Sequence, residues 1–138
     1  MTMTYDEFMA QPKKVWGRVL HKADEVFRIE TVCLKSTTVL GERVQSTFEN
    51  SLEKNYVALA KSKDELGKLL MLHKEKQEEV RGWLTDNLNE EDADLLEWRY
   101  VNCKSPKEVA RLLGEQEQTV RNKQSRADQR ARKLFGKI

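Results

Sequence analysis

Amide, guanidinium and hydroxyl side chains recur near the carboxyl end of the chain at spacings that place them together on one side of a helix. They are Gln118, Arg121, Asn122 and Ser125. Arginine can bond guanine through two hydrogen bonds, and asparagine or glutamine can bond adenine in the same way. We therefore predict that these four side chains contact the bases of double-stranded DNA.

Basic residues surround this set and continue beyond it. Residues 99–138 carry 11 Lys/Arg and 4 Asp/Glu, a net charge of +7, whereas residues 1–98 carry 14 and 19, a net charge of −5. Neutralising phosphates suits such residues, and we predict that role for Lys123, Arg126, Arg130, Arg132, Lys133 and Lys137. A solvated basic helix end is the alternative for this tail, because cations favour helix C termini. That alternative does not account for the amide-rich start of the helix.

Three start signals and one stop signal position these side chains. Ser105 is a capping residue, Pro106 suits a first helical position and Glu108 completes a capping box. Gly114 stands where a left-handed C-terminal cap is needed. A short turn then leads to a second helix that starts near residue 117, which predicts a helix-turn-helix. The predicted apolar faces of the two helices are Val109, Ala110, Leu112 and Leu113, then Thr119, Val120, Ala127, Ala131 and Leu134.

Another helix is predicted before this motif, with Asn89 as its N-cap and acidic residues in its first turns. Its buried side is predicted to comprise Leu95, Leu96, Trp98 and Tyr100. The sequence "NCK" at 102–104 is expected to end it.

Two longer helices are predicted in the N-terminal part. Thr4 and Glu7 resemble a capping box for a short turn, and Pro12 is expected to begin a helix over about 13–33. Its stripe is Val15, Val19, Val26, Ile29 and Cys33, widened by Trp16, Leu20, Ala23 and Phe27. A polar connection is expected at 35–51, followed by a helix to about 84 with Leu52, Leu59, Leu66, Leu69, Leu70, Val80, Trp83 and Leu84 on its apolar stripe.

These elements predict an all-α protein, in which an N-terminal helical hairpin (1–85) is followed by a helix-turn-helix domain (86–138). The stripes suit packing within the hairpin, and they also leave open a homodimer through the N-terminal helices.

Other classes of function are disfavoured. Two cysteines and two histidines stand apart, so neither a metal site nor another cofactor is expected, and no nucleophile or phosphate-loop spacing suggests an enzyme. No apolar run approaches the ~20 residues that span a bilayer. A cytoplasmic protein that does not contact membranes is therefore expected.

The segment from 95 to 134 resembles region four of bacterial sigma factors. It reads LLEWRYVNCKSPKEVARLLGEQEQTVRNKQSRADQRARKL. The whole layout is similar to small transcription regulators of Gram-positive bacteriophages, of the ArpU and RinA kind. The resemblance implies a trihelical core of Leu95, Leu96, Trp98, Tyr100, Val109, Ala110, Leu113 and Val120, and phosphate contacts by Ser105 and Lys107.

Two residues depart from the family's pattern. Gln116 replaces the usual Ser or Thr cap of the recognition helix, and Gln124 replaces an apolar residue. We expect a weaker cap at Gln116. At Gln124 we expect a frayed helix, or cover by the N-terminal helices or a partner chain.

Two functions remain open on these grounds. The first is a sequence-specific transcription regulator that reads the major groove. The second is a protein-interaction module that binds RNA polymerase or another host factor, which the acidic segment from Asp86 to Glu97 favours because it contains no Lys or Arg.

Overall fold

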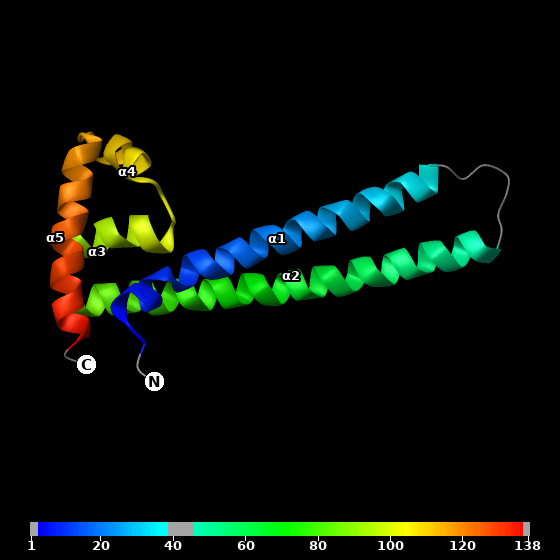
Figure 1. Cartoon of the computed structure of the whole chain (residues 1–138), viewed down its shortest axis with the longest axis horizontal. Helices are drawn as coiled ribbons and strands as arrows, with labels where there is room; N and C mark the ends of the chain where they lie inside the picture. The colour runs from blue at the N-terminus through cyan, green and yellow to red at the C-terminus, as the bar shows by residue number, and fades with distance from the viewer. Residues whose placement is uncertain (1–2, 39–45, 137–138) are drawn as a thin grey trace. The chain divides into compact units, whose positions relative to one another are not determined.

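The computed structural model describes residues 3–38 and 46–136, and over these ranges the protein is all-α (Figure 1). The elements are α1 (Tyr5–Thr38), α2 (Ser46–Asn87), α3 (Glu90–Leu96), a π-helical segment η1 (Glu97–Val101), α4 (Pro106–Leu113) and α5 (Glu117–Phe135). Helices α1 and α2 pack as a long hairpin, and the shorter helices follow. The predicted fold class is confirmed. None of the described helices is both long and apolar enough to cross a membrane.

Helix α1 begins earlier than predicted and continues through Pro12. The Glu7 N–H donates to Thr4 Oγ1 at 3.2 Å, and the Thr4 N–H donates to Glu7 Oε2 at 3.4 Å, so the capping box is confirmed. The predicted start of the long helix at Pro12 is wrong, because this proline lies inside the helix and is fully buried. Burial of the first two turns offsets the cost of about 3 kcal/mol that an interior proline carries.

Both long helices also extend into the predicted connection. Helix α1 ends at Thr38 and α2 begins at Ser46, so 35–38 and 46–51 are helical where a connection was expected. The rest of that segment, the side chain of Leu52 and all of Lys137 lie outside the described residues.

The chain divides into two compact units. The terminal unit comprises Met1–Val15 and His73–Ile138, and the hairpin unit comprises Trp16–Leu72. These units differ from the predicted division at 85/86, because the first turns of α1 and the last turns of α2 pack with the C-terminal helices.

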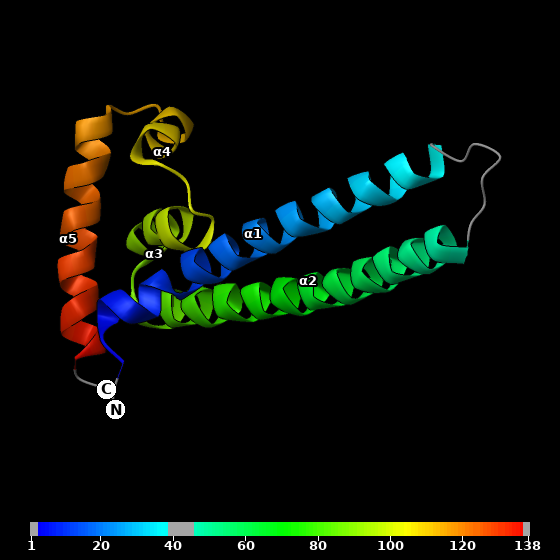
Figure 2. The ribbon, with the colours of Figure 1, turned by 45° about the vertical axis from the view of Figure 1, so that its right-hand side comes forward.

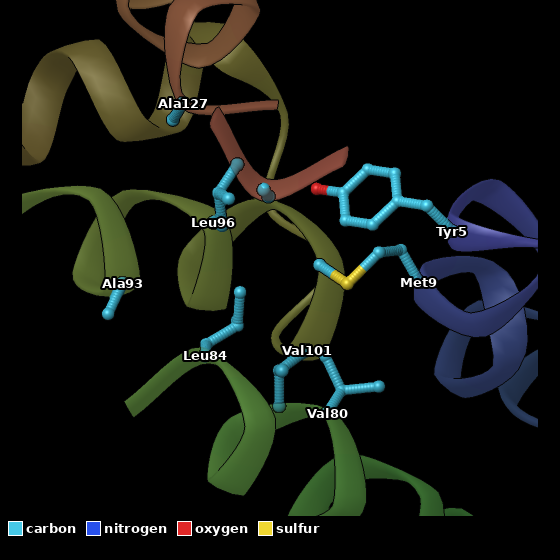
Figure 3. Packing of buried hydrophobic residues seen from close by; sticks show 9 residues of the cluster. Tyr5, Met9, Val80, Leu84, Ala93, Leu96, Val101 and Ala127 are labelled. Carbon is cyan, nitrogen blue, oxygen red and sulfur yellow. The ribbon is translucent and has the colours of Figure 1, made fainter. Parts of the chain in front are cut away.

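The main core of the terminal unit gathers side chains from both ends of the sequence. Tyr5 and Met9 project from α1 toward residues of α2, α3 and η1 (Figure 3). The buried members are Tyr5, Met9, Val80, Leu84, Ala93, Leu96, Val101, Ala127 and Ala131. The N-terminal turn is therefore part of this core.

Four aromatic rings extend this core. Phe135 of α5 lies 5.4 Å from Phe8, 5.6 Å from Trp83 and 6.0 Å from Tyr5, measured between ring centroids. Separations of 4.5–7 Å with tilted rings are favourable for aromatic pairs. This aromatic cluster fixes the end of α5 against α1 and α2.

A smaller core lies under the helix-turn-helix. It consists of Leu95, Val109, Ala110 and Val120, with Trp98 packed against it. The π-helical segment explains why Trp98 and the residues that follow it belong to different cores. Its turn is wider than that of an α-helix, so Tyr100 and Val101 pack in the main core. The predicted trihelical core is therefore right for these five residues, whereas Leu96 and Tyr100 belong to the main core.

The hairpin unit buries small or slender side chains. On α1 these are Val19, Val26 and Cys33, and on α2 Ser62 is buried. Ion pairs join the two helices, with Lys22 Nζ 2.7 Å from Glu65 and Lys63 Nζ 3.1 Å from Glu30.

Several large apolar residues that were predicted to widen the stripe of the first helix, and one predicted on the stripe of the second, are exposed. They are Trp16, Leu20 and Phe27 on α1, and Leu70 on α2. The predicted widening is therefore wrong, because the narrow stripe next to it already fills the contact between the two helices.

Candidate nucleic-acid interface

Helix α4 starts and ends as its sequence predicts. Ser105 Oγ accepts a hydrogen bond from the Glu108 N–H at 3.2 Å, and Pro106 is the first helical residue. Gly114 adopts the left-handed conformation, with φ of 67°. The Glu115 N–H donates to the Ala110 carbonyl at 2.9 Å and closes the last turn. The turn into α5 is therefore geometrically fixed.

Helix α5 starts without a side-chain cap. Gln116 occupies the N-cap position and its side chain makes no capping hydrogen bond, as the sequence predicts. Val120 anchors this end instead, since it is completely buried in the smaller core. Helices α3 and α4 both lie on one side of α5, with α4 near its start (Figures 1 and 2).

The four predicted base-contacting residues are all exposed on α5. They lie away from the buried positions 120, 127 and 131. Gln118 donates to Asn122 Oδ1 at 3.1 Å, and Arg121 pairs with Glu117 at 2.7 Å. Both are exposed contacts across one helical turn, which cost little to exchange for contacts with a ligand. The structure thus presents Gln118, Arg121, Asn122 and Ser125 as one polar surface.

A groove joins this surface to the start of α4. It has a volume of about 430 Å³ and is lined by Arg99, Pro106, Arg121, Gln124, Ser125, Asp128, Gln129 and Arg132. Three of these residues are arginines, so the groove is suited to an anionic ligand. Pro106 lines this groove, whereas its neighbours Ser105 and Lys107 do not, and of these two Lys107 is exposed.

Part of the predicted phosphate-contacting set lies on the other flank of α5. Lys123, Arg126 and Arg130 line a cavity of about 430 Å³ together with carboxylates of α3 and the turn. Lys123 Nζ lies 2.6 Å from Glu115, and Arg130 makes two hydrogen bonds to Asp92, at 2.8 and 2.9 Å. The pairing with Glu115 raises the pKa of Lys123. Both cations therefore stabilise carboxylates of their own chain.

Two more members of that set lie near the end of α5. Arg132 lies 2.9 Å from Asp6 and 5.6 Å from the ring centroid of Tyr5, and its hydrogen bond to Asp6 raises its pKa. Lys133 is exposed. The structure does not bring the predicted phosphate contacts onto one surface, because they divide between two flanks of the helix.

Gln124 has partners within its own unit. Arg99 Nε donates to Gln124 Oε1 at 2.6 Å, and Gln124 Nε2 donates to the Tyr100 hydroxyl at 3.3 Å. The amide is half-buried and the helix is regular around it. The expectations of fraying and of cover by the N-terminal helices are therefore wrong, since polar residues of η1 satisfy this side chain.

Asp128 is an unpredicted buried carboxylate. It accepts hydrogen bonds from the Tyr5 hydroxyl at 2.7 Å and from the Tyr100 hydroxyl at 3.0 Å. Burial, followed by the neighbouring carboxylate, raises the pKa of Tyr100 to about 12 and also raises the pKa of Tyr5. From the sequence Asp128 was only the single acid in a basic tail, and nothing there indicated its distant tyrosine partners.

Three residues that were predicted on the apolar faces of the two helices are exposed, so their assignment is wrong. Leu112 and Leu113 are 56% and 42% exposed. Thr119 is also exposed. Helix α4 has only eight residues, so Val109 and Ala110 suffice to fill its contact with α3 and α5.

Gln129 was missed as a candidate contact. It is exposed on α5, lines the groove and follows Ser125 by four residues. Extending the spacing of the predicted set by one helical turn would have found it.

The described residues contain no group of three His, Cys, Asp or Glu side chains that could hold a metal ion. Comparisons with protein-family models, with curated proteins and with solved structures gave no match.

Proposed function

We propose that this protein is a sequence-specific DNA-binding transcription regulator that reads the major groove with α5. The observation that carries the proposal is the joint surface of two elements, in which Arg121 and Ser125 of α5 line a groove together with Pro106 at the start of α4, while the amides of Gln118 and Asn122 are exposed on the same helix. A helix with base-reading groups beside a second helix whose start approaches the backbone is the docking geometry of helix-turn-helix proteins.

The groups divide by role in this proposal. Gln118, Arg121, Asn122 and Ser125 contact base edges, and each good two-bond contact contributes about 1–3 kcal/mol of discrimination. Lys107 and Lys133 are exposed cations and contact phosphates. Arg130 acts first within the fold, because its two hydrogen bonds to Asp92 hold α5 on α3.

The experiment is selection of bound duplexes from a random pool at two salt concentrations, followed by titration of the selected duplex and a scrambled one. Asn122→Ala is expected to weaken the selected duplex roughly 5- to 150-fold and to leave the scrambled one unchanged. Lys133→Ala is the matched control, since it should weaken both duplexes alike and reduce the salt slope by about 1. Specificity that survives both Arg121→Ala and Asn122→Ala would reject this reading face, and absence of duplex binding at low salt would reject the function.

A second function has its own observation. Glu91 and Asp94 of α3 line the cavity on the other flank of α5, together with Trp98 and the exposed Leu113. Acidic groups around apolar side chains suit a protein partner such as RNA polymerase. Binding of nuclease-treated, purified polymerase that Glu91→Lys weakens and Asn122→Ala does not would support this function.

A further inference from the structure

The hairpin unit carries an apolar row that its own packing leaves exposed. On α1 the row contains Leu20 and Phe27, which are 53% and 66% exposed, and on α2 it contains Tyr56 and Leu70, which are 46% and 45% exposed. Leu20 and Phe27 each follow by one position a buried valine of α1, and Tyr56 and Leu70 lie seven residues before and after Lys63, which follows the buried Ser62. The row is therefore distinct from the contact that holds the hairpin together.

The spacing of this row is that of a coiled-coil seam. On α1, Leu20, Phe27 and Leu34 follow one another at intervals of seven, and Trp16 and Ala23 occupy the intervening positions. On α2, Tyr56, Lys63 and Leu70 repeat the interval, with Ala60 and Gly67 between them. Apolar residues at alternating spacings of four and three present a continuous seam to another helix.

The rows on the two helices lie on one face of the hairpin. In two antiparallel helices, positions one residue beyond the contact turn to the same side. The ion pair between Glu30 and Lys63, at 3.1 Å, supports this, because Lys63 belongs to the row on α2 and Glu30 follows Phe27 of the row on α1 by three positions. The ion pair between Lys22 and Glu65 lies on the opposite side of the hairpin from this row. Neither residue belongs to the exposed row of its helix. We call the face with Leu20, Phe27, Tyr56 and Leu70 the outer seam.

The charges of the outer seam complement those of a second copy of the same face. On this face the acidic Glu30 of α1 lies beside the basic Lys63 of α2, at the same height along the hairpin. A two-fold axis parallel to the helices places α2 of a second copy over α1 of the first. Glu30 of each copy then lies opposite Lys63 of the other. In the turns next to this level, Phe27 then lies opposite Gly67 of the second copy, and Ala23 lies opposite its Leu70. Nucleic acid would require an excess of positive charge, which this face lacks.

We propose that the outer seam is a homodimer interface, in which two hairpin units form a four-helix bundle. Such bundles pack helices at heptad positions around a shared core. The contact is isologous, because the same face serves both chains. The inference goes beyond the proposed DNA binding and does not depend on it.

Sedimentation equilibrium of the full chain without DNA tests the interface. The wild-type protein is expected to sediment at twice the chain mass, and Phe27→Glu is expected to weaken the dimer at least 100-fold. Val32→Glu is the matched control, since Val32 is 48% exposed on α1 but on the opposite side, and it should leave the dimer intact. Circular dichroism establishes that both variants remain helical. A monomeric wild-type protein at all concentrations, or equal effects of the two variants, would overturn the proposal.

A charge exchange tests the pairing itself. Glu30→Lys or Lys63→Glu alone places like charges together at the centre of the outer seam and should weaken the dimer at least tenfold. The double exchange restores opposite charges and should return the dimer to within about threefold of the wild type. If the double variant were as weak as the singles, the charge arrangement would be wrong.

A DNA titration separates this inference from the proposed function. A duplex with one half-site should bind the wild type and Phe27→Glu equally, whereas a duplex with two half-sites should bind Phe27→Glu more weakly. Loss of DNA binding with an intact dimer would reject the proposed function alone. DNA binding by a monomeric wild-type chain would reject the interface alone.

Discussion

The terminal unit and the hairpin unit bury opposite kinds of side chain. In the terminal unit, Tyr5, Phe8, Trp83 and Phe135 pack together, and buried polar groups are hydrogen-bonded around Asp128. In the hairpin unit, valines and Cys33 are buried while large side chains such as Phe27 face outward. A two-helix contact has room only for a narrow stripe, whereas five packed segments enclose bulky rings. The first unit should therefore be stable by its own contacts, and the second should gain stability from a partner.

The largest expected effect separates the two units directly. Leu96→Ala removes a completely buried side chain from the main core and should lower the free energy of unfolding by about 2–5 kcal/mol. Val57→Ala is the control in the hairpin unit, where Val57 is 63% exposed, and should change it by less than about 0.5 kcal/mol. Chemical denaturation measures both, and comparable losses would contradict the comparison.

The next effect concerns the buried polar group of the terminal unit. Asp128→Asn removes the charge that accepts hydrogen bonds from Tyr5 and Tyr100, and charge-assisted bonds of this kind contribute about 1.5–3 kcal/mol. A loss of that size in thermal or chemical unfolding is expected. Asp64→Asn, at an exposed position of the hairpin unit, is the control. A stability equal to the wild type would show that the tyrosines do not need the carboxylate.

Alkaline pH should reduce the stability that the hydrogen bonds of Tyr5 and Tyr100 to Asp128 provide. Burial and Asp128 raise the pKa values of Tyr5 and Tyr100, so the folded state holds these protons more tightly than the unfolded state. The resulting stability is fully present below pH 10 and falls as pH rises through the unfolded value toward the folded ones. Between pH 10 and 11, each tyrosine should account for about 1 kcal/mol of this loss.

Tyr5→Phe isolates one of these contributions. It should reduce the loss between pH 10 and 11 by that amount, measured by denaturation at each pH. An unchanged pH dependence in this variant would mean that Tyr5 ionises alike in both states.

The smallest expected effect is a gain. Cys103 adopts a φ of 54°, the left-handed conformation that favours glycine, where the π-helical segment ends. Cys103→Gly should raise the free energy of unfolding by about 0.5–1 kcal/mol. Cys103→Ala keeps the Cβ atom and should give no gain. A gain with both variants would place the cause in the thiol and not in the backbone.

Local signals in the sequence determined much of the helix-turn-helix. The caps at Asn89 and Ser105, the turn at Gly114 and the uncapped start at Gln116 all follow the predicted positions. These features depend on hydrogen bonds between residues at most a few positions apart, which a sequence shows directly. The exposure of the predicted base-contacting residues followed from the same short-range periodicity.

Only the tertiary structure decided which distant residues meet. Nothing near Tyr5 in sequence indicates that its hydroxyl reaches Asp128, and nothing near Phe135 indicates the rings of Phe8 and Trp83. Nor could local pattern show that Arg130 binds Asp92 and that Leu112 is exposed. Burial and ion pairing depend on how segments far apart in the chain share space, so they appear only once the helices are packed.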